Sequence, residues 1–312
     1  MANGAKKVAV IGAGNVGATC AFVLAERKVG DVVLLDIYEG FAKGKALDMS
    51  QGGQVLNYDG RVTGTKDYAD IADSDVVVVT SGFPRQPGMT REDLIGKNAD
   101  IVSQVGEGIR QHAPNSIVVM VTNPLDLMTY HMQKVTGFEH SRVVGQAGIL
   151  DSARMTHFIA QAIGCSNEDV QAMVLGGHGD TMVPLPRYTT VNGIPVSQLL
   201  SDEEVEAICQ RTASGGGEIV KLLEKGSAFY APGSAAAIMA EAVLEDRKRV
   251  LPCSTYLSGE YGMDDIYIGV PVVLGRNGVE RIIELELAEK ELDSLQGSGS
   301  FYKEQLSEIL GY

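Results

Sequence analysis

The sequence predicts an α/β protein in which a doubly wound parallel sheet is followed by a second domain of mixed α+β structure. Apolar β-branched runs in the first half lack polar alternation, which is typical of parallel strands buried on both faces. Longer stretches with helical spacing separate these runs. After about residue 148 the pattern changes to longer helices and hairpin signals, so we expect domains at 1–148 and 149–312.

The first half alternates strands and helices, as right-handed βαβ units require. Helical spacing marks 17–28 and 90–112. Because the carboxyl ends of parallel strands lie along one sheet edge, we expect a ligand to bind there. The predicted strands are VAVIG (8–12), DVVLLD (31–36), DVVVVTSG (75–82), SIVVMVTNP (116–124) and RVVGQAG (142–148).

The second half begins with VQAMVLGG (170–177), which predicts one strand, and Asn192-Gly193 marks a hairpin. Long helical stretches cover 202–249, and strands and a terminal helix follow. Two segments rich in small residues fall within the predicted helices. SGGGE (214–218) predicts a kink, and GSGS (297–300) is expected to interrupt the last helix.

The composition of the 312 residues excludes several classes of protein. A formal net charge of −14 without a basic stripe argues against nucleic acid as a partner. The apolar runs are well under the roughly 20 residues needed to span a bilayer, and MANGAKK shows no signal-peptide pattern. Four scattered cysteines form no CxxC pair, so we expect no disulfides, no zinc site and a reducing cytoplasm.

The stretch GAGNVG (12–17) follows a strand and opens a helix, which predicts a Rossmann-type dinucleotide-binding turn. Gly12 would allow the tight turn, Gly14 would let the backbone approach a pyrophosphate, and Gly17 would let the helix pack closely on the strand. Asp36 ends the next strand about 20 residues on, where a carboxylate accepts from ribose hydroxyls. That carboxylate would repel a 2′-phosphate, so we expect NAD; the alternative is a glycine-rich turn that binds nothing.

Two strand ends carry weaker signals. The backbone of TSGFP (80–84) could pass beneath a cofactor, or could form an ordinary turn. In VTNPLD (121–126), Asn123 could donate to a substrate oxygen or merely cap the next helix. The local sequence leaves both pairs of alternatives open.

His178 stands apart from the other histidines because it lies between glycines in GGHGD (176–180), at the end of an apolar strand. Imidazole exchanges a proton near neutral pH, as oxidation of a carbinol requires. The more common alternative for a lone histidine at a strand end is a structural role. Asp180 is close in sequence but could diverge from it in the turn.

Asp151 and Arg154 are three residues apart in GILDSARMTHFIA (148–160), so they share one helix face. In polar surroundings they would form a surface ion pair worth only about 0.5 kcal/mol. The flanking residues are instead apolar, which predicts a largely buried helix. Buried charges need a partner or a ligand, so the pair is a candidate site.

The loop FPRQPGMTR (83–91) places two cations on a short Pro-Gly turn of an acidic chain. Thr90 and Asp93 fit a capping box, with Arg91 at the first helical position, where it adds to the attraction of the helix dipole for an anion. Arg85 lies across the turn. Two solvated arginines are one interpretation; the other is a bound group with two negative charges.

Together these motifs resemble the lactate/malate dehydrogenase superfamily, and more closely its lactate-dehydrogenase-like malate dehydrogenases. The resemblance runs essentially end to end, from VAVIGAGNVG to IGVPVVLG (268–275). It implies a Rossmann-type NAD domain followed by a catalytic domain. The cofactor-binding residues that it implies are Gly12, Gly14, Asn15, Val16, Gly17, Asp36, Thr80, Gly82, Asn98, Val121 and Asn123.

The resemblance also implies roles for substrate-site residues. His178 would be the acid/base, oriented by Asp151. Arg154 would hold the substrate's α-carboxylate in a bidentate fork, and Arg91 would polarise the reacting carbonyl. Asn123 matches the family's substrate-binding asparagine.

Arg85 is the position that predicts the substrate. In the family, glutamine here goes with lactate and arginine with a dicarboxylate, and leaving this cation unpaired in a closed site would cost several kcal/mol. The resemblance therefore implies reversible NAD-dependent oxidation of (S)-malate to oxaloacetate. Ala228, in GSAFYAPG (226–233), would leave room for the second carboxylate.

Three alternatives remain at this point. The nearest is a lactate dehydrogenase of the same superfamily. An NAD-dependent glycosidase would need a metal cluster, and the spacing of His157 and Cys165 does not place them on one helical face. The third is a non-catalytic NAD-binding protein. We expect no metal, and a homodimer or homotetramer, as in the family.

Overall fold

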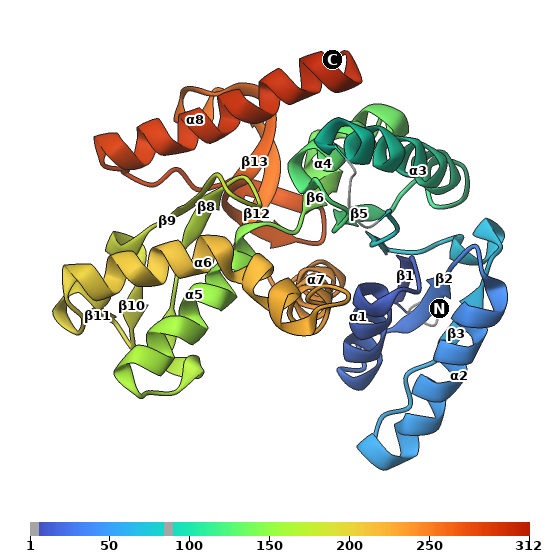
Figure 1. The fold of residues 1–312 in the computed structure, drawn as a ribbon. Helices are drawn as coiled ribbons and strands as arrows, with labels where there is room; N and C mark the ends of the chain where they lie inside the picture. The colour runs from blue at the N-terminus through green and yellow to red at the C-terminus, as the bar shows by residue number, and fades with distance from the viewer. Residues whose placement is uncertain (1–5, 84–89) are drawn as a thin grey trace.

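The computed structural model describes residues 6–83 and 90–312 and confirms the α/β fold (Figure 1). Its main sheet has the order β3-β2-β1-β4-β5-β6-β12-β13-β8-β9, with β14 paired to β13. Neighbouring strands from β3 to β6 run parallel. These parallel strands are β1 (Lys7–Ile11), β2 (Asp31–Leu35), β3 (Val62–Thr65), β4 (Val76–Val79), β5 (Ile117–Met120) and β6 (Val143–Gly145).

Helices connect the parallel strands, as predicted. All four valines of β4 are buried, and so is every residue of β5, which explains why these runs lack polar alternation. The β3 segment VTGT was not predicted as a strand; it is an edge strand with a glycine and only partial burial. The helices of this half are α1 (Asn15–Glu26), α2 (Glu39–Leu56), α3 (Arg91–His112) and α4 (Leu125–Thr136).

The second half adds antiparallel strands and four further helices. The hairpin predicted at Asn192-Gly193 is confirmed by the pairing of β10 with β11. The helices are α5 (Gly148–Ile163), α6 (Asp202–Leu223), α7 (Tyr230–Leu244) and α8 (Glu289–Gln305). The strands are β7 (Val170–Gln171), β8 (Val174–Gly176), β9 (Met182–Pro184), β10 (Thr190–Val191), β11 (Ile194–Pro195), β12 (Arg249–Ser258), β13 (Asp264–Gly275) and β14 (Gly278–Ile282).

Two sequence-based expectations for this half are wrong. The segment 170–177 is not one strand: β7 pairs with β10 in a separate three-stranded sheet, whereas β8 pairs with β9 and β13 in the main sheet. GSGS (297–300) does not interrupt the last helix, since α8 continues through it. Ser298 and Gly299 are buried there, so close packing against neighbouring elements holds the helix where propensity alone would weaken it.

The two halves join directly. Gly145 of β6 pairs with Ser254 of β12, so the parallel and antiparallel parts form one continuous sheet. In Figure 1, α7 lies beside α1, although they come from opposite halves of the chain. At their contact a Cβ on Gly233 would lie 2.6 Å from Thr19 Cβ, so glycine allows the close approach. Because α5 follows β6 immediately, its first turn lies at the carboxyl edge of the parallel strands.

Within residues 6–83 and 90–312, none of the helices is both long enough and apolar enough to cross a membrane.

Candidate active site

The glycine-rich turn between β1 and α1 leaves room for a phosphate group. Gly12 has φ +104°, and a Cβ there would lie 2.7 Å from the Ser81 amide nitrogen. A Cβ on Gly17 would overlap the Gly12 carbonyl oxygen, so α1 packs directly on the turn. At Gly14, by contrast, no described atom outside the two neighbouring residues lies within 4 Å of the Cβ position. Gly14 is the N-cap of α1 and provides no side-chain cap, so first-turn N–H groups of Asn15 and Val16 suit an anion.

Asp36 and Thr80 fix this turn from the neighbouring strand ends. Asp36 Oδ2 accepts from Ala13 N at 2.7 Å, and Oδ1 accepts from Tyr38 N at 2.9 Å. A carboxylate has further lone pairs for ribose hydroxyls. Thr80 Oγ1 donates to the Gly12 carbonyl at 3.0 Å. The turn, the open space at Gly14 and the carboxylate at the end of β2 together fit a dinucleotide without a 2′-phosphate.

The remaining predicted cofactor residues lie at the ends of β4 and β5 or in α3. Asn98 is buried; its Oδ1 accepts from Phe83 N at 2.6 Å, and its Nδ2 donates to the Asn123 carbonyl at 2.6 Å. The structure therefore shows Asn98 bridging the chain segments that follow β4 and β5. Gly82 and Asn123 are exposed and Val121 is partly buried, so these residues are accessible from the same sheet edge.

His178, Asp151 and Arg154 meet at the junction of β8 and α5. The His178 Nδ1 lies 2.9 Å from Asp151 Oδ2, and Arg154 donates from one guanidinium nitrogen to Asp151 Oδ1 at 3.1 Å. The Asp151 side chain is 2% exposed, and those of His178 and Arg154 are each 14% exposed. Asp180, which is close to His178 in sequence, is exposed; the carboxylate bonded to the imidazole is Asp151.

The carboxylate of Asp151 controls the protonation of His178. Burial alone would lower the pKa of His178, and the Arg154 charge also opposes protonation. The charge and hydrogen bond of Asp151, with a smaller contribution from Asp126, outweigh both, so the pKa of His178 is raised above its usual value. Because Asp151 bonds to Nδ1, the other ring nitrogen, Nε2, remains for proton transfer.

The glycines of SGGGE (214–218) make room for Arg154. A Cβ on Gly215 would lie 3.3 Å from Arg154 Cδ, and one on Gly216 would lie 3.4 Å from a guanidinium nitrogen. The helix α6 nevertheless runs through this segment without a break. The segment that predicted a kink therefore packs against the arginine of the site, which the sequence did not reveal.

Two further side chains hold the backbone around His178, and sequence reasoning missed both. Asp126, in the first turn of α4, accepts from His178 N at 2.9 Å and from Ser254 Oγ at 2.7 Å. Ser298, on α8, accepts from Gly177 N at 3.0 Å. Asp126 belongs to the quoted motif VTNPLD, but nothing in its sequence neighbourhood points to a partner 52 residues away.

The cationic loop is only partly described. Arg85 lies outside the described residues, and so does the Arg91 side chain. The capping box is confirmed, since Thr90 Oγ1 accepts from Asp93 N and Asp93 accepts from Thr90 N, with Arg91 as the first residue of α3. Ala228 is partly buried in the segment between α6 and α7.

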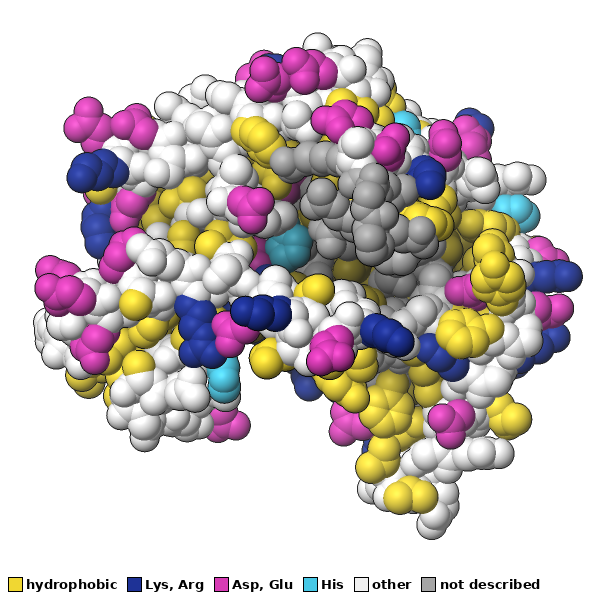
Figure 2. Space-filling model, viewed as in Figure 1, with side chains coloured by type: hydrophobic (Ala, Val, Ile, Leu, Met, Phe, Trp, Pro, Cys, Tyr) yellow, Lys and Arg dark blue, Asp and Glu magenta, His cyan; other side chains and the backbone are white. Residues whose placement is uncertain are grey.

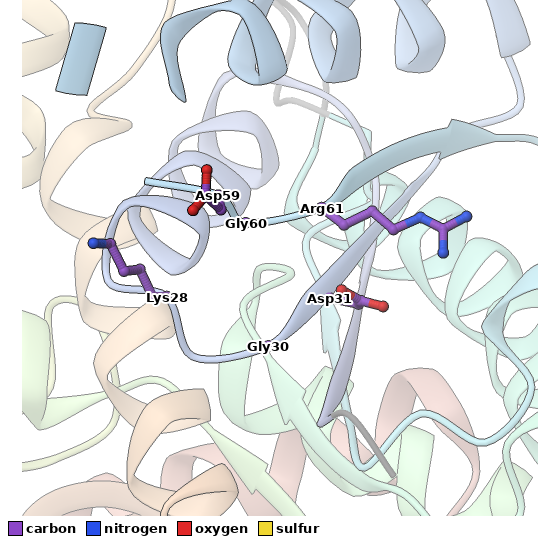
Figure 3. A pocket seen from close by; sticks show the side chains of 6 residues that line it. All are labelled: Lys28, Gly30, Asp31, Asp59, Gly60 and Arg61. Atoms are coloured by element: carbon purple, nitrogen blue, oxygen red, sulfur yellow. The ribbon is translucent and has the colours of Figure 1, made fainter. Parts of the chain in front are cut away.

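The surface of this side of the molecule agrees with a recessed site. Figure 2 shows a histidine side chain near the middle of this face, set back behind its neighbours. A separate hollow of about 230 Å³ lies elsewhere, lined by Lys28, Gly30, Asp31, Asp59, Gly60 and Arg61 (Figure 3). Its residues surround the start of β2, at the opposite edge of the sheet from the glycine turn. In the described part of the chain, no cluster of three or more His, Cys, Asp or Glu side chains is arranged to hold a metal ion.

Comparison with known proteins agrees with this geometry. The family model for the lactate/malate dehydrogenase NAD binding domain matches residues 6–145, and that for the lactate/malate dehydrogenase alpha/beta C-terminal domain matches residues 149–311.

Individual relatives cover nearly the whole chain. Malate dehydrogenase of Methanosarcina acetivorans is 54% identical over 97% of this chain and 99% of its own. The structure of malate dehydrogenase from Salinibacter ruber superposes with a TM-score of 0.94 at 50% identity, covering 97% of each chain. A Cryptosporidium parvum lactate dehydrogenase, solved with lactic acid and nicotinamide adenine dinucleotide, has a TM-score of 0.93 at 43% identity, covering 98% of each chain. With both family models matched in order and relatives at this identity, the chain belongs to the lactate/malate dehydrogenase family.

Proposed function

We propose that this chain is an NAD-dependent malate dehydrogenase that interconverts (S)-malate and oxaloacetate. The observation that carries the proposal is the buried bridge of Asp151 between His178 and Arg154. It joins a proton-transfer group to a carboxylate-binding cation at the edge of the sheet where the glycine turn lies. Curated relatives at 53–57% identity are malate dehydrogenases, and this supports the same substrate here.

His178 acts as the acid/base. Protonated, it donates to the carbonyl oxygen of oxaloacetate; neutral, it accepts the hydroxyl proton of malate. Asp151 fixes the tautomer through Nδ1 and stabilises the imidazolium. When bound, NAD supplies the hydride acceptor and NADH the hydride donor. The glycine turn (12–17) and Asp36 would hold the dinucleotide, with Thr80, Gly82, Asn98, Val121 and Asn123 along the same edge.

The arginines of the site orient the substrate. Arg154, held by Asp151 on one side, binds the α-carboxylate. Arg91, at the N-terminus of α3, polarises the reacting carbonyl, and Asn123 donates to a substrate oxygen. Arg85 pairs with the second carboxylate and so selects a dicarboxylate, with Ala228 leaving space for it. No metal has a role in this scheme, because arginines and imidazole cover the charge and the proton.

The deciding measurement is kcat/KM with NADH for oxaloacetate and for pyruvate, on wild type and Arg85→Gln. We expect wild type to prefer oxaloacetate by about a thousandfold or more, and the preference to collapse in the variant. Arg61→Gln is the matched control, since it removes the same charge at the opposite edge of the sheet (Figure 3) and should change neither value. A preference for pyruvate in wild type would instead identify a lactate dehydrogenase.

We further propose that residues 1–148 form the NAD-binding domain and residues 149–312 the substrate domain, and that the protein is a cytoplasmic homodimer or homotetramer. Exposed apolar side chains on α2, Phe41, Leu47, Val55 and Leu56, support a contact between copies. Figure 2 shows yellow side chains gathered over this helix.

A further inference from the structure

The peptide backbone of the histidine loop is held at two consecutive amides by side chains from distant elements. Gly177 N donates to Ser298 Oγ on α8, and His178 N donates to Asp126 Oδ2 on α4. Ser298 in turn donates to Thr181 Oγ1 at 2.8 Å, further along the same loop. The ring of Tyr302 packs on Gly177, where a Cβ would overlap it. The loop is therefore fixed from two sides.

The two acceptors differ in charge. Ser298 is neutral, whereas Asp126 is a carboxylate in a residue only 1% exposed. Its described partners are the His178 amide and the Ser254 hydroxyl, and both are neutral donors. An asparagine could accept the same amide hydrogen bond without a buried charge. Burial raises the pKa of Asp126 to about 6, although both hydrogen bonds and His178 oppose that rise.

A charge at this position acts on the charge that forms on His178, since Asp126 favours the protonated imidazole. Imidazolium appears and disappears in each turnover of the proposed reaction, and a fixed carboxylate behind it stabilises the protonated form. Among the side chains that the structure describes, the charged groups that act on His178 are Asp151 and Arg154 from α5 and Asp126 from α4. From α8 the loop is met by Ser298 and Tyr302. Since Arg154 cancels part of the Asp151 charge, the second carboxylate of Asp126 keeps the net charge around the imidazolium negative.

We propose that Asp126 is a positioning residue for His178, which fixes the backbone of the histidine loop and places a second negative charge beside the imidazolium. The inference rests on the proposed function for its catalytic consequence, but the effect on the imidazole is a property of the protein alone. Ser254 acts through Asp126, since its hydroxyl donates to the other carboxylate oxygen and favours the charged form.

The test is the titration of His178 in the protein without cofactor or substrate, followed by NMR of ¹³C-labelled histidine. His178→Gln identifies the resonance. In Asp126→Asn we expect the pKa of His178 to fall, with about a tenfold loss of proton affinity, because one stabilising charge is removed. Ser298→Ala is the matched control: it removes the acceptor of the adjacent amide without changing charge, and the His178 pKa should stay at the wild-type value.

The pH dependence of malate oxidation is the second measurement. The acid limb of kcat/KM for malate oxidation should move to lower pH in Asp126→Asn, and kcat should fall about tenfold with little change in KM, since Asp126 does not bind substrate. Thermal stability above pH 6 should be maintained or raised, because a costly buried charge is gone. A residue with a merely structural role would lower the melting temperature and leave the His178 titration unchanged.

Two results would overturn the inference: an unchanged His178 titration in Asp126→Asn, or an equal shift in Ser298→Ala. Should Asp126→Asn fail to fold, Ser254→Ala replaces it. We then expect a smaller downward shift of the His178 pKa, and an unchanged His178 pKa in Ser254→Ala would contradict the proposal. If wild type does not oxidise malate while the NMR shift is present, the proposed function fails and the role of Asp126 stands.

Discussion

Asp151 bridges His178, the proposed acid/base, and Arg154, the proposed carboxylate-binding residue. Asp151→Asn removes the largest contribution that raises the pKa of His178, so that pKa should fall. The bond to Arg154 would weaken at the same time. We expect kcat/KM for malate oxidation to fall by about 10²–10⁴, as for orienting carboxylates of other acid/base histidines, and its acid limb to move to lower pH. Steady-state kinetics from pH 5 to 9 test this.

The direction of the pH effect follows from the reaction. In the proposed reaction neutral His178 accepts the proton of malate, so malate oxidation should decline as His178 becomes protonated, and a lower pKa should move this limb to lower pH. Oxaloacetate reduction needs protonated His178, so its basic limb should move down as well. A limb that moved to higher pH, or an activity within a factor of about two of wild type, would rule out this role for Asp151.

At the residue scale, the sequence identified side chains better than their contacts. His178 and its neighbours in GGHGD were visible as a motif, and the family resemblance supplied Asp151 as the partner that local spacing could not identify. Asp126 was missed because its hydrogen bonds span 52 and 128 residues. Such pairs depend on how α4 and β12 pack against the histidine loop, and that packing leaves no local pattern in either segment.

At the scale of the element, α6 is expected to affect substrate affinity through its contact with Arg154, the proposed carboxylate-binding residue. Gly215 packs against the Arg154 stem, so Gly215→Ala should displace the guanidinium and raise KM for oxaloacetate about tenfold. Alanine should also favour the helix by about 1 kcal/mol. Higher KM together with a melting temperature that is not lowered is therefore the expected combination, measured by kinetics and thermal denaturation.

Gly217 provides the control for this helix, because no described atom other than the adjacent residues and the helix's own backbone lies within 4 Å of its Cβ position. Gly217→Ala should stabilise α6 by a similar amount and leave KM unchanged. Equal KM values for the two alanine variants would show that the α6 glycines do not position Arg154.

At the element scale, the sequence predicted the parallel strands well because apolar β-branched runs are a strong local signal. The sequence-based prediction failed where contacts between distant elements determine where strands and helices begin and end. The run 170–177 is mostly apolar, yet two sheets share it as β7 and β8. GSGS contains weak helix formers, but the contacts of Ser298 with the histidine loop and the close packing of Gly299 on Met263 hold α8 intact.

At the scale of the whole molecule, an ion pair on a buried carboxylate connects the two halves. Glu241 of α7 is 3% exposed and pairs with Arg27, just after α1, at 2.9 Å and with Arg247 at 2.8 Å. Because Arg27 follows α1 and Glu241 lies on α7, this contact holds the second half of the chain against the first. Sequence spacing could not reveal it, since Arg27 and Glu241 lie 214 residues apart.

One face of α2 is expected to form the contact between two copies of the chain. Phe41, Gly44, Asp48, Gly52 and Val55 recur at spacings of three or four residues, so they share one helical face. Glycines inside a helix cost an isolated helix about 1 kcal/mol each, but they allow a second helix to approach closely. Val55 is 78% exposed and Phe41 48%. A second copy of α2 packed on this face would bury both.

We therefore expect a dimer or tetramer by sedimentation equilibrium, and dissociation of the α2 contact in Val55→Glu, since a buried unpaired carboxylate on each side of the interface is strongly unfavourable. The His178 site should remain folded in the dissociated form, because the bonds of Asp151 and Asp126 all lie within one chain. Ile194→Glu places the same charge on the exposed β10–β11 hairpin and should leave the α2 contact intact. A monomeric wild type, or a Val55→Glu variant with unchanged mass, would show that this face of α2 does not mediate assembly.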